Sequence, residues 1–183
     1  QIRILDKDNV SKLVKLSRGT HLVFDEADIP LTVSTVLFSP LDQRPLFLIK
    51  RDGCFLFGTT DEWDDSEPDA PAPHEHDVEY LITSLQQFLP DSQINRDKVR
   101  FIYSGFRTLP IREAKSAPSS VTRDEVIEIS PSGLITVIGG KLTTARIIAK
   151  RALKYVLRQT GNPGRWSLCR THKLPIGSSS EEI

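Results

Sequence analysis

The chain contains 183 residues, and its 24 lysines and arginines are balanced by 24 aspartates and glutamates. With 38% hydrophobic and 26% charged residues, this composition is typical of one soluble globular domain. The balanced charge argues against a nucleic-acid partner, because such a partner requires a positive field spread over one face.

The sequence predicts neither a membrane span nor a secretory signal, since no apolar run approaches the ~18–20 residues that cross a bilayer. Cys54 and Cys169 form no Cys-x-x-Cys pair, which argues against a disulfide framework or a structural zinc site and favours a reducing, cytoplasmic compartment. The chain contains no methionine, so we expect it to be part of a longer polypeptide.

Short β-branched or aromatic runs predict strands in the first third of the chain, at 20–24, 33–38, 46–50 and 54–58. Arg51-Asp52-Gly53 predicts a hairpin turn, because glycine adopts the positive φ that tight turns need. The acidic, proline-rich stretch 61–73 is predicted to be a surface loop.

Apolar residues at spacings of three and four predict an amphipathic helix over 75–89. Further strands are predicted at 99–104, 126–129 and 134–138, a loop at 111–120, and a final helix at 142–158. Strands outnumber helices and most neighbours look hairpin-connected. We therefore predict an α+β fold with a mixed, mostly antiparallel β-sheet and flanking helices.

A glycine-rich hexapeptide lies where the last predicted strand gives way to the last helix: Gly139-Gly140-Lys141-Leu142-Thr143-Thr144. Its glycines allow close backbone approach, and the N–H groups of a first helical turn favour an anion. The spacing is not that of a P-loop, and a strand-to-helix turn with a solvated lysine is the simpler interpretation. No Gly-x-Gly-x-x-Gly occurs, so the chain cannot supply the pyrophosphate end of a dinucleotide site.

Two arginines are predicted near strand ends, Arg107 just past the strand 99–104 and Arg123 just before the strand 126–129. A guanidinium offers a planar fork of donors to phosphate or carboxylate oxygens. A surface salt bridge is the simpler interpretation of each arginine alone. Together with Lys141 they predict an oxyanion site.

The histidines of the sequence predict a candidate base but not a metal site. His74 and His76 are adjacent to carboxylates but lack the spacing of a helical metal pair, so a helix start rich in acidic residues is the simpler account. His21, at a predicted strand start, is the better candidate for acid–base chemistry, although a hydrogen-bonded sheet histidine would look the same.

The motifs of this chain resemble, in order and interval, those of FAD-dependent glycerol-3-phosphate dehydrogenases. They are Arg18-Gly19-Thr20-His21, Gly58-Thr59-Thr60-Asp61, Tyr103-Ser104-Gly105-Phe106-Arg107, Thr122-Arg123-Asp124 and the hexapeptide from Gly139 to Thr144. The resemblance covers about positions 17 to 158.

The resemblance implies oxidation of sn-glycerol 3-phosphate to dihydroxyacetone phosphate, with FAD as cofactor and quinone as acceptor. His21 matches the position of the base, Arg123 the phosphate-side arginine, and Arg107 the arginine beside the flavin and the substrate hydroxyls. Lys141 and the hexapeptide match the segment that faces the flavin. The resemblance also allows peripheral contact of the longer protein with the inner membrane.

In the family, a Rossmann part with the FAD fingerprint precedes this region and a helical domain follows it. We therefore expect residues 1–158 to form the substrate-binding part and residues 159–183 a linker, with the isolated chain inactive.

Phe106 replaces a valine that is usual in the family. Two further departures adjoin candidate site residues: Thr108 replaces a usual proline, and Ala145 a usual aromatic. They leave open a related flavin enzyme that acts on another small hydroxy or amino compound. A non-catalytic anion-binding module is the alternative from a different class.

Overall fold

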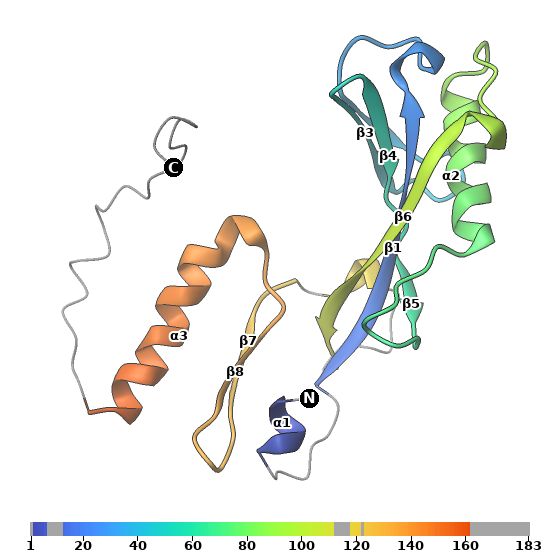
Figure 1. Ribbon diagram of the computed structural model, residues 1–183. Coiled ribbons are helices and arrows are strands. Elements are labelled where there is room, and N and C mark those ends of the chain that lie inside the picture. The colour runs from blue at the N-terminus through green and yellow to red at the C-terminus, as the bar shows by residue number, and fades with distance from the viewer. Residues whose placement is uncertain (1, 7–12, 112–117, 122, 162–183) are drawn as a thin grey trace, which may run out of the picture.

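Strand β1 (Val14–Asp25) is the centre of the main sheet in the computed structural model, which describes residues 2–6, 13–111, 118–121 and 123–161. One edge of β1 pairs with β6 (Val99–Pro110) along nearly its whole length. The other edge pairs first with β5 (Glu62–Asp64) and then with β4 (Cys54–Gly58). The sheet continues through β3 (Pro45–Arg51) to β2 (Thr35–Phe38), and the pairings described are all antiparallel (Figure 1).

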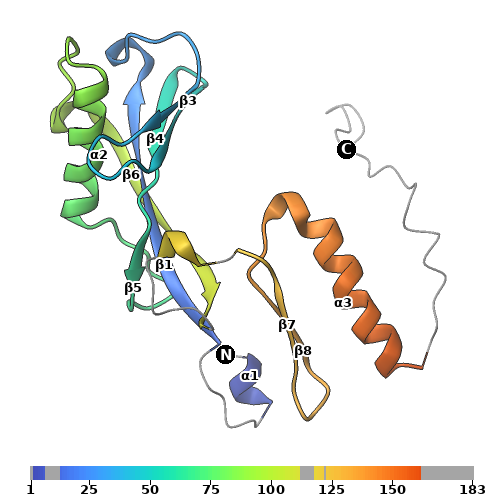
Figure 2. The ribbon, with the colours of Figure 1, turned by 180° about the vertical axis from the view of Figure 1, so that it is seen from behind.

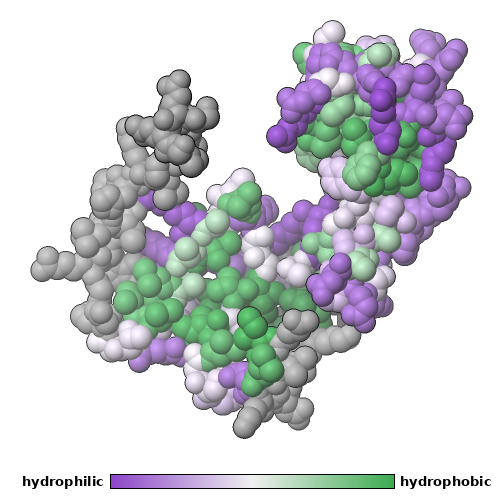
Figure 3. All heavy atoms as spheres, in the orientation of Figure 1, coloured by the Kyte–Doolittle hydropathy of each residue, from purple (hydrophilic) through white to green (hydrophobic). Residues whose placement is uncertain are grey.

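Helix α2 (Glu75–Phe88) covers one face of this sheet. Its buried residues pack on alternate residues of the strands, and the core comprises Leu22, Phe24, Leu46, Leu48, Phe55, Phe57, Val78, Leu81 and Leu85. We call the opposite side of the sheet the open face. Phe47 is 46% exposed there, and hydrophobic residues gather over β3 and β4 (Figure 3).

A two-stranded hairpin of β7 (Val126–Ile129) and β8 (Ile135–Ile138) leads into a 3₁₀ turn at Leu142–Thr144 and then helix α3 (Ala145–Gln159). Both views show the hairpin and α3 beside each other and apart from the main sheet (Figures 1 and 2). A short helix α1 (Ile2–Leu5) opens the described chain.

The α+β prediction with a mostly antiparallel sheet is confirmed. The hairpin turn is confirmed as well, since φ is +48° at Asp52 and +78° at Gly53. The hairpin-connected pattern holds only in part, because β1 pairs with three strands that do not follow it directly. Among the described residues, no helix is long and apolar enough to cross a membrane.

Several predicted boundaries were wrong: β2 begins at Thr35 rather than at 33, and α3 begins at Ala145 rather than at 142. Strand β1 begins at Val14 rather than at 20, and β6 runs to Pro110 rather than to 104, because their polar halves pair with each other. The surface loop 61–73 contains β5 and two buried carboxylates, Asp61 and Asp64. The predictions for 112–117, for Cys169 and for residues 162–183 lie outside the described residues.

Candidate functional site

Alternation along β1 separates two sets of polar residues. Arg18 and Thr20 point toward α2, where both contact Asp77. The residues between and beside them, Ser17, Gly19 and His21, therefore point to the open face. His21 lies within the strand and not at its start, contrary to the sequence-based expectation.

Arg107 lies on the open face opposite Ser17, inside β6 and not past its end as predicted. Its Nη1 donates to the Thr60 carbonyl at 3.3 Å, and its Nη2 to Thr59 Oγ1 at 3.1 Å. A Cβ on Gly19 would lie 2.5 Å from Arg107 Nη1, so the glycine makes room for the guanidinium across β1.

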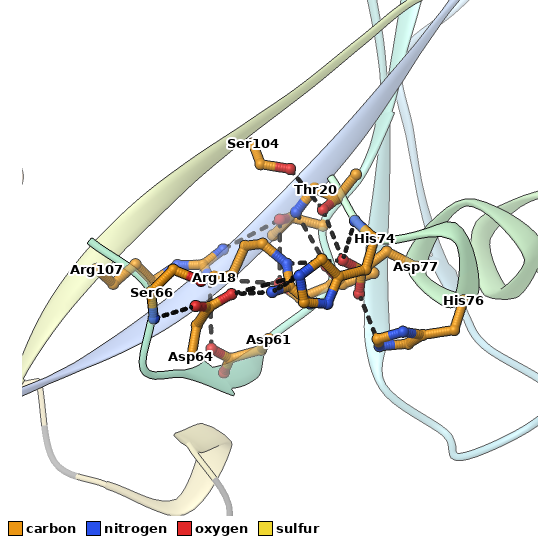
Figure 4. Close-up of polar contacts among 12 residues, drawn as sticks. Arg18, Thr20, Asp61, Asp64, Ser66, His74, His76, Asp77, Ser104 and Arg107 are labelled. Carbon is orange, nitrogen blue, oxygen red and sulfur yellow. Dashed lines mark hydrogen bonds and ion pairs between the residues drawn. The ribbon is translucent and has the colours of Figure 1, made fainter. Parts of the chain in front are cut away.

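Asp61 joins the two arginines. Arg107 Nη1 lies 3.3 Å from Asp61 Oδ1, and Arg123 Nη2 lies 3.4 Å from Asp61 Oδ2. Ser17 Oγ also donates to Oδ1. Figure 4 shows Arg107 and Asp61 beside the lower half of β1. The structure thus brings together two of the predicted cations through a carboxylate to which the sequence analysis gave no role.

In the described part of the chain, two guanidiniums face the single carboxylate of Asp61. Burial lowers the pKa of Arg107, Asp61 raises it, and the nearby charges of Arg123 and Arg44 lower it again. A guanidinium stays protonated at neutral pH in any case. The excess positive charge favours an anionic ligand.

His21 lies on the same face, stacked on Tyr103 with ring centroids 5.0 Å apart. Burial lowers the pKa of His21, and the charge of Arg107 lowers it further. The imidazole is therefore neutral at neutral pH and able to accept a proton. Its Nδ1 is buried and has no hydrogen-bond partner among the described residues.

A pair of glycines lies between the strand position of His21 and that of Arg107. Gly19 pairs with Gly105 across β1 and β6, between the His21–Tyr103 pair and the Ser17–Arg107 pair. A Cβ on Gly105 would meet nothing within 4 Å. The sheet is therefore bare at Gly105, and we call this position the glycine shelf.

On the α2 side of β1, a buried ion cluster holds the strand. The Arg18 side chain is 1% exposed, its Nε donates to Asp77 Oδ2 at 2.9 Å, and its Nη1 pairs with Asp64 (Figure 4). His74 Nε2 lies 3.1 Å from Arg18 Nη1. Two residues of the segment 74–77, His74 and Asp77, thus contact Arg18. Among the described residues, no group of three or more His, Cys, Asp or Glu side chains is placed to hold a metal.

The hexapeptide lies, as predicted, between β8 and the last helix. Gly139 and Gly140 have φ of +72° and +86°, which glycine adopts readily. Lys141 and Leu142 are exposed, and neither Lys141 nor Thr144 caps the helical turns with its side chain. Asp61 joins Arg107 and Arg123, and neither of these two ion pairs includes Lys141, so the predicted convergence of Lys141 stays a prediction.

The family described as FAD dependent oxidoreductase matches residues 3–153. The chain belongs to that family of FAD dependent oxidoreductases.

Relatives and solved structures agree with this class. The chain is 33% identical to the aerobic glycerol-3-phosphate dehydrogenase of Bacillus subtilis over 96% of its own length and 32% of the relative. It is 29% identical to the enzyme of the same name from Staphylococcus haemolyticus, with the same coverage. A solved glycerol-3-phosphate dehydrogenase from Bacillus halodurans, complexed with FAD, is similar with a TM-score of 0.77 and 29% identity, over 90% of this chain and 31% of that one. The chain spans about a third of the length of the curated relatives it matches.

Proposed function

We propose that this chain supplies the substrate side of an FAD-dependent dehydrogenase that oxidises sn-glycerol 3-phosphate to dihydroxyacetone phosphate. The meeting of Arg107 and Arg123 at Asp61, on the face that carries His21, is the observation that supports it most. The names of the relatives support the same substrate.

The two arginines would bind the phosphate dianion, because a guanidinium pairs with phosphate oxygens through charge-assisted hydrogen bonds. Arg123 would provide the phosphate contact, and Arg107, nearer the shelf, would also contact the substrate hydroxyls. His21 would take the proton of the hydroxyl at C2, since its lowered pKa keeps the imidazole free to accept one.

The residues fit FAD at its flavin end. The glycine turn Gly139-Gly140 and the uncapped start of the following helix offer backbone donors and positive charge, together with Lys141. When bound, FAD supplies the acceptor for the hydride of C2. We assign its pyrophosphate to residues outside this chain, because the chain has no Gly-x-Gly-x-x-Gly.

We also propose residues 1–158 as the substrate-binding part, 159–183 as a linker, and quinone as the acceptor of a protein that contacts the membrane peripherally. A different small hydroxy or amino substrate is the second candidate. It is favoured by Thr108, an exposed residue directly after Arg107 where the family usually has proline.

The test is flavin reduction in a single turnover, in the flavin-loaded polypeptide that carries this chain. We expect rapid bleaching with glycerol 3-phosphate and slow bleaching with glycerol. Equal rates with both would contradict a phosphate site. The absorbance spectrum of the purified 183-residue chain separates an apo module, which is colourless, from a chain that retains flavin.

A further inference from the structure

Asp61 is buried, with 4% of its surface exposed, although it begins the most acidic stretch of the sequence. Its partners come from three separate segments: Ser17 in β1, Arg107 in β6 and Arg123 ahead of β7. A carboxylate is retained in such a place only when it is well paired. The pairing therefore fixes the two arginines as much as it stabilises Asp61.

We propose that Asp61 is a positioning residue for phosphate recognition, and this inference rests on the proposed function. Arg107 and Arg123 reach different oxygens of Asp61, at 3.3 and 3.4 Å. Both distances exceed the ~2.7–2.9 Å of a tight charge-assisted bond. A guanidinium has five N–H donors, and one carboxylate oxygen does not occupy all of them. Asp61 therefore orients each arginine and leaves N–H groups available for the phosphate.

The physical benefit is alignment before the ligand arrives. Two guanidiniums repel each other, and without Asp61 they would separate in the free protein. The anion would then have to draw them together, which weakens binding. A carboxylate that merely competed with the anion would have the opposite effect, because its removal would strengthen binding. The sign of the change therefore distinguishes the two roles.

The experiment titrates inorganic phosphate into the 183-residue chain and follows the arginine Nε–Hε resonances by NMR. We expect those of Arg107 and Arg123 to shift together in the unsubstituted chain. In Asp61→Asn we expect affinity to fall by about ten-fold or more, and the two resonances to titrate separately. Asp64→Asn is the matched control, since Asp64 is also buried but pairs with Arg18 on the α2 side, and phosphate affinity should be unchanged.

Unchanged or tighter phosphate binding in Asp61→Asn overturns the inference while leaving the phosphate site intact. An equal loss in the Asp64→Asn control overturns it too, because a general loss of structure would then explain both. If the unsubstituted chain shows no response to phosphate, the proposed phosphate site fails and this inference with it. Should Asp61→Asn not fold, Ser17→Ala decides: it removes one donor to Asp61, and a smaller loss of affinity is expected, whereas no loss overturns the inference.

Discussion

A side chain at Gly105, on the glycine shelf, should lower activity without destabilising the fold. Gly105 is exposed in β6, its φ lies outside the left-handed region, and a Cβ there would meet nothing within 4 Å. A Cβ at position 105 therefore introduces no clash with the described residues, and the two methyl groups of Gly105→Val extend from it over the open face. Because glycine in a strand costs roughly 0.5–1 kcal/mol relative to alanine, the variant should be as stable as the parent or more stable by about that amount.

The valine side chain of Gly105→Val would occupy the space between His21 and Arg107, where the proposed substrate lies. Once the substrate fills this space, overpacking it costs about 1–3 kcal/mol, which corresponds to about 5- to 150-fold in binding or rate. We expect Gly105→Val to lower kcat/KM for glycerol 3-phosphate by that factor. The kcat/KM of Gly105→Ala should lie between those of the unsubstituted protein and Gly105→Val.

The assay pairs flavin reduction in the loaded enzyme with thermal unfolding of the same preparation. Activity retained in Gly105→Val, at unchanged stability, would show that no ligand uses the shelf. Loss of activity together with a lower unfolding temperature would point instead to a distorted strand.

Four further substitutions test the surroundings of the shelf and the ion cluster on the other side of β1. Arg123→Ala should lose about 10- to 150-fold of the preference for glycerol 3-phosphate over glycerol in flavin reduction, whereas Lys141→Ala should be slow with both substrates. Arg107→Gln should raise the pKa of His21 toward its ordinary 6.5, because it removes a charge that lowers it, as measured by NMR titration of the histidine ring protons. Arg18→Met should destabilise the chain by about 3–5 kcal/mol, since it leaves two buried carboxylates without their cation, as measured by urea unfolding.

Each of these has an outcome that would contradict it. A preserved preference in Arg123→Ala removes its phosphate role, and an unshifted His21 titration removes the coupling to Arg107. For Arg18, the control is Arg100→Met, which breaks an exposed pair with Asp25 and should cost less than about 1 kcal/mol. Equal effects of the two substitutions would show that the buried cluster is no stronger than a surface pair.

The stability of the Arg18 cluster should also depend on pH. Burial raises the pKa of Asp77, but hydrogen bonds from Arg18 and Thr20 and the charge of Arg18 outweigh it, so the pKa lies below its ordinary 3.8. Its stabilising contribution is therefore present above the unfolded pKa and lost as pH falls through the folded one. Arg18→Met should reduce this acid dependence, as measured by urea unfolding across pH.

Local patterns predicted the elements that bury an apolar face of their own. Helix α2 shows its spacing of three and four in the sequence, and β4 is a short apolar run with the predicted bounds. The polar halves of β1 and β6 show no such pattern. Ser17 and Arg107 are strand residues because the two strands pair with each other, and that pairing joins segments about 90 residues apart.

Sequence motifs pointed to single residues of the candidate site, but they did not show that three segments of the chain meet there. Arg107 and Arg123 were singled out because arginine near a strand end is a common anion ligand. Asp61 was not, because an acid in a stretch rich in acids and prolines is normally solvated. In the structure it is buried and paired with residues of β1, β6 and the segment before β7.

A buried acid inside the proposed anion site is compatible with anion binding, because it lowers the electrostatic attraction but orders the two arginines. Arg107 and Arg123 with Asp61 carry one net positive charge instead of two, which weakens the long-range pull on a dianion. In return, the guanidiniums are held before the ligand arrives, and the cost of ordering two long side chains is met during folding rather than during binding. Two unpaired arginines would attract any anion from any direction. The aligned pair favours a ligand whose oxygens match its geometry, beside the imidazole that is free to take a proton.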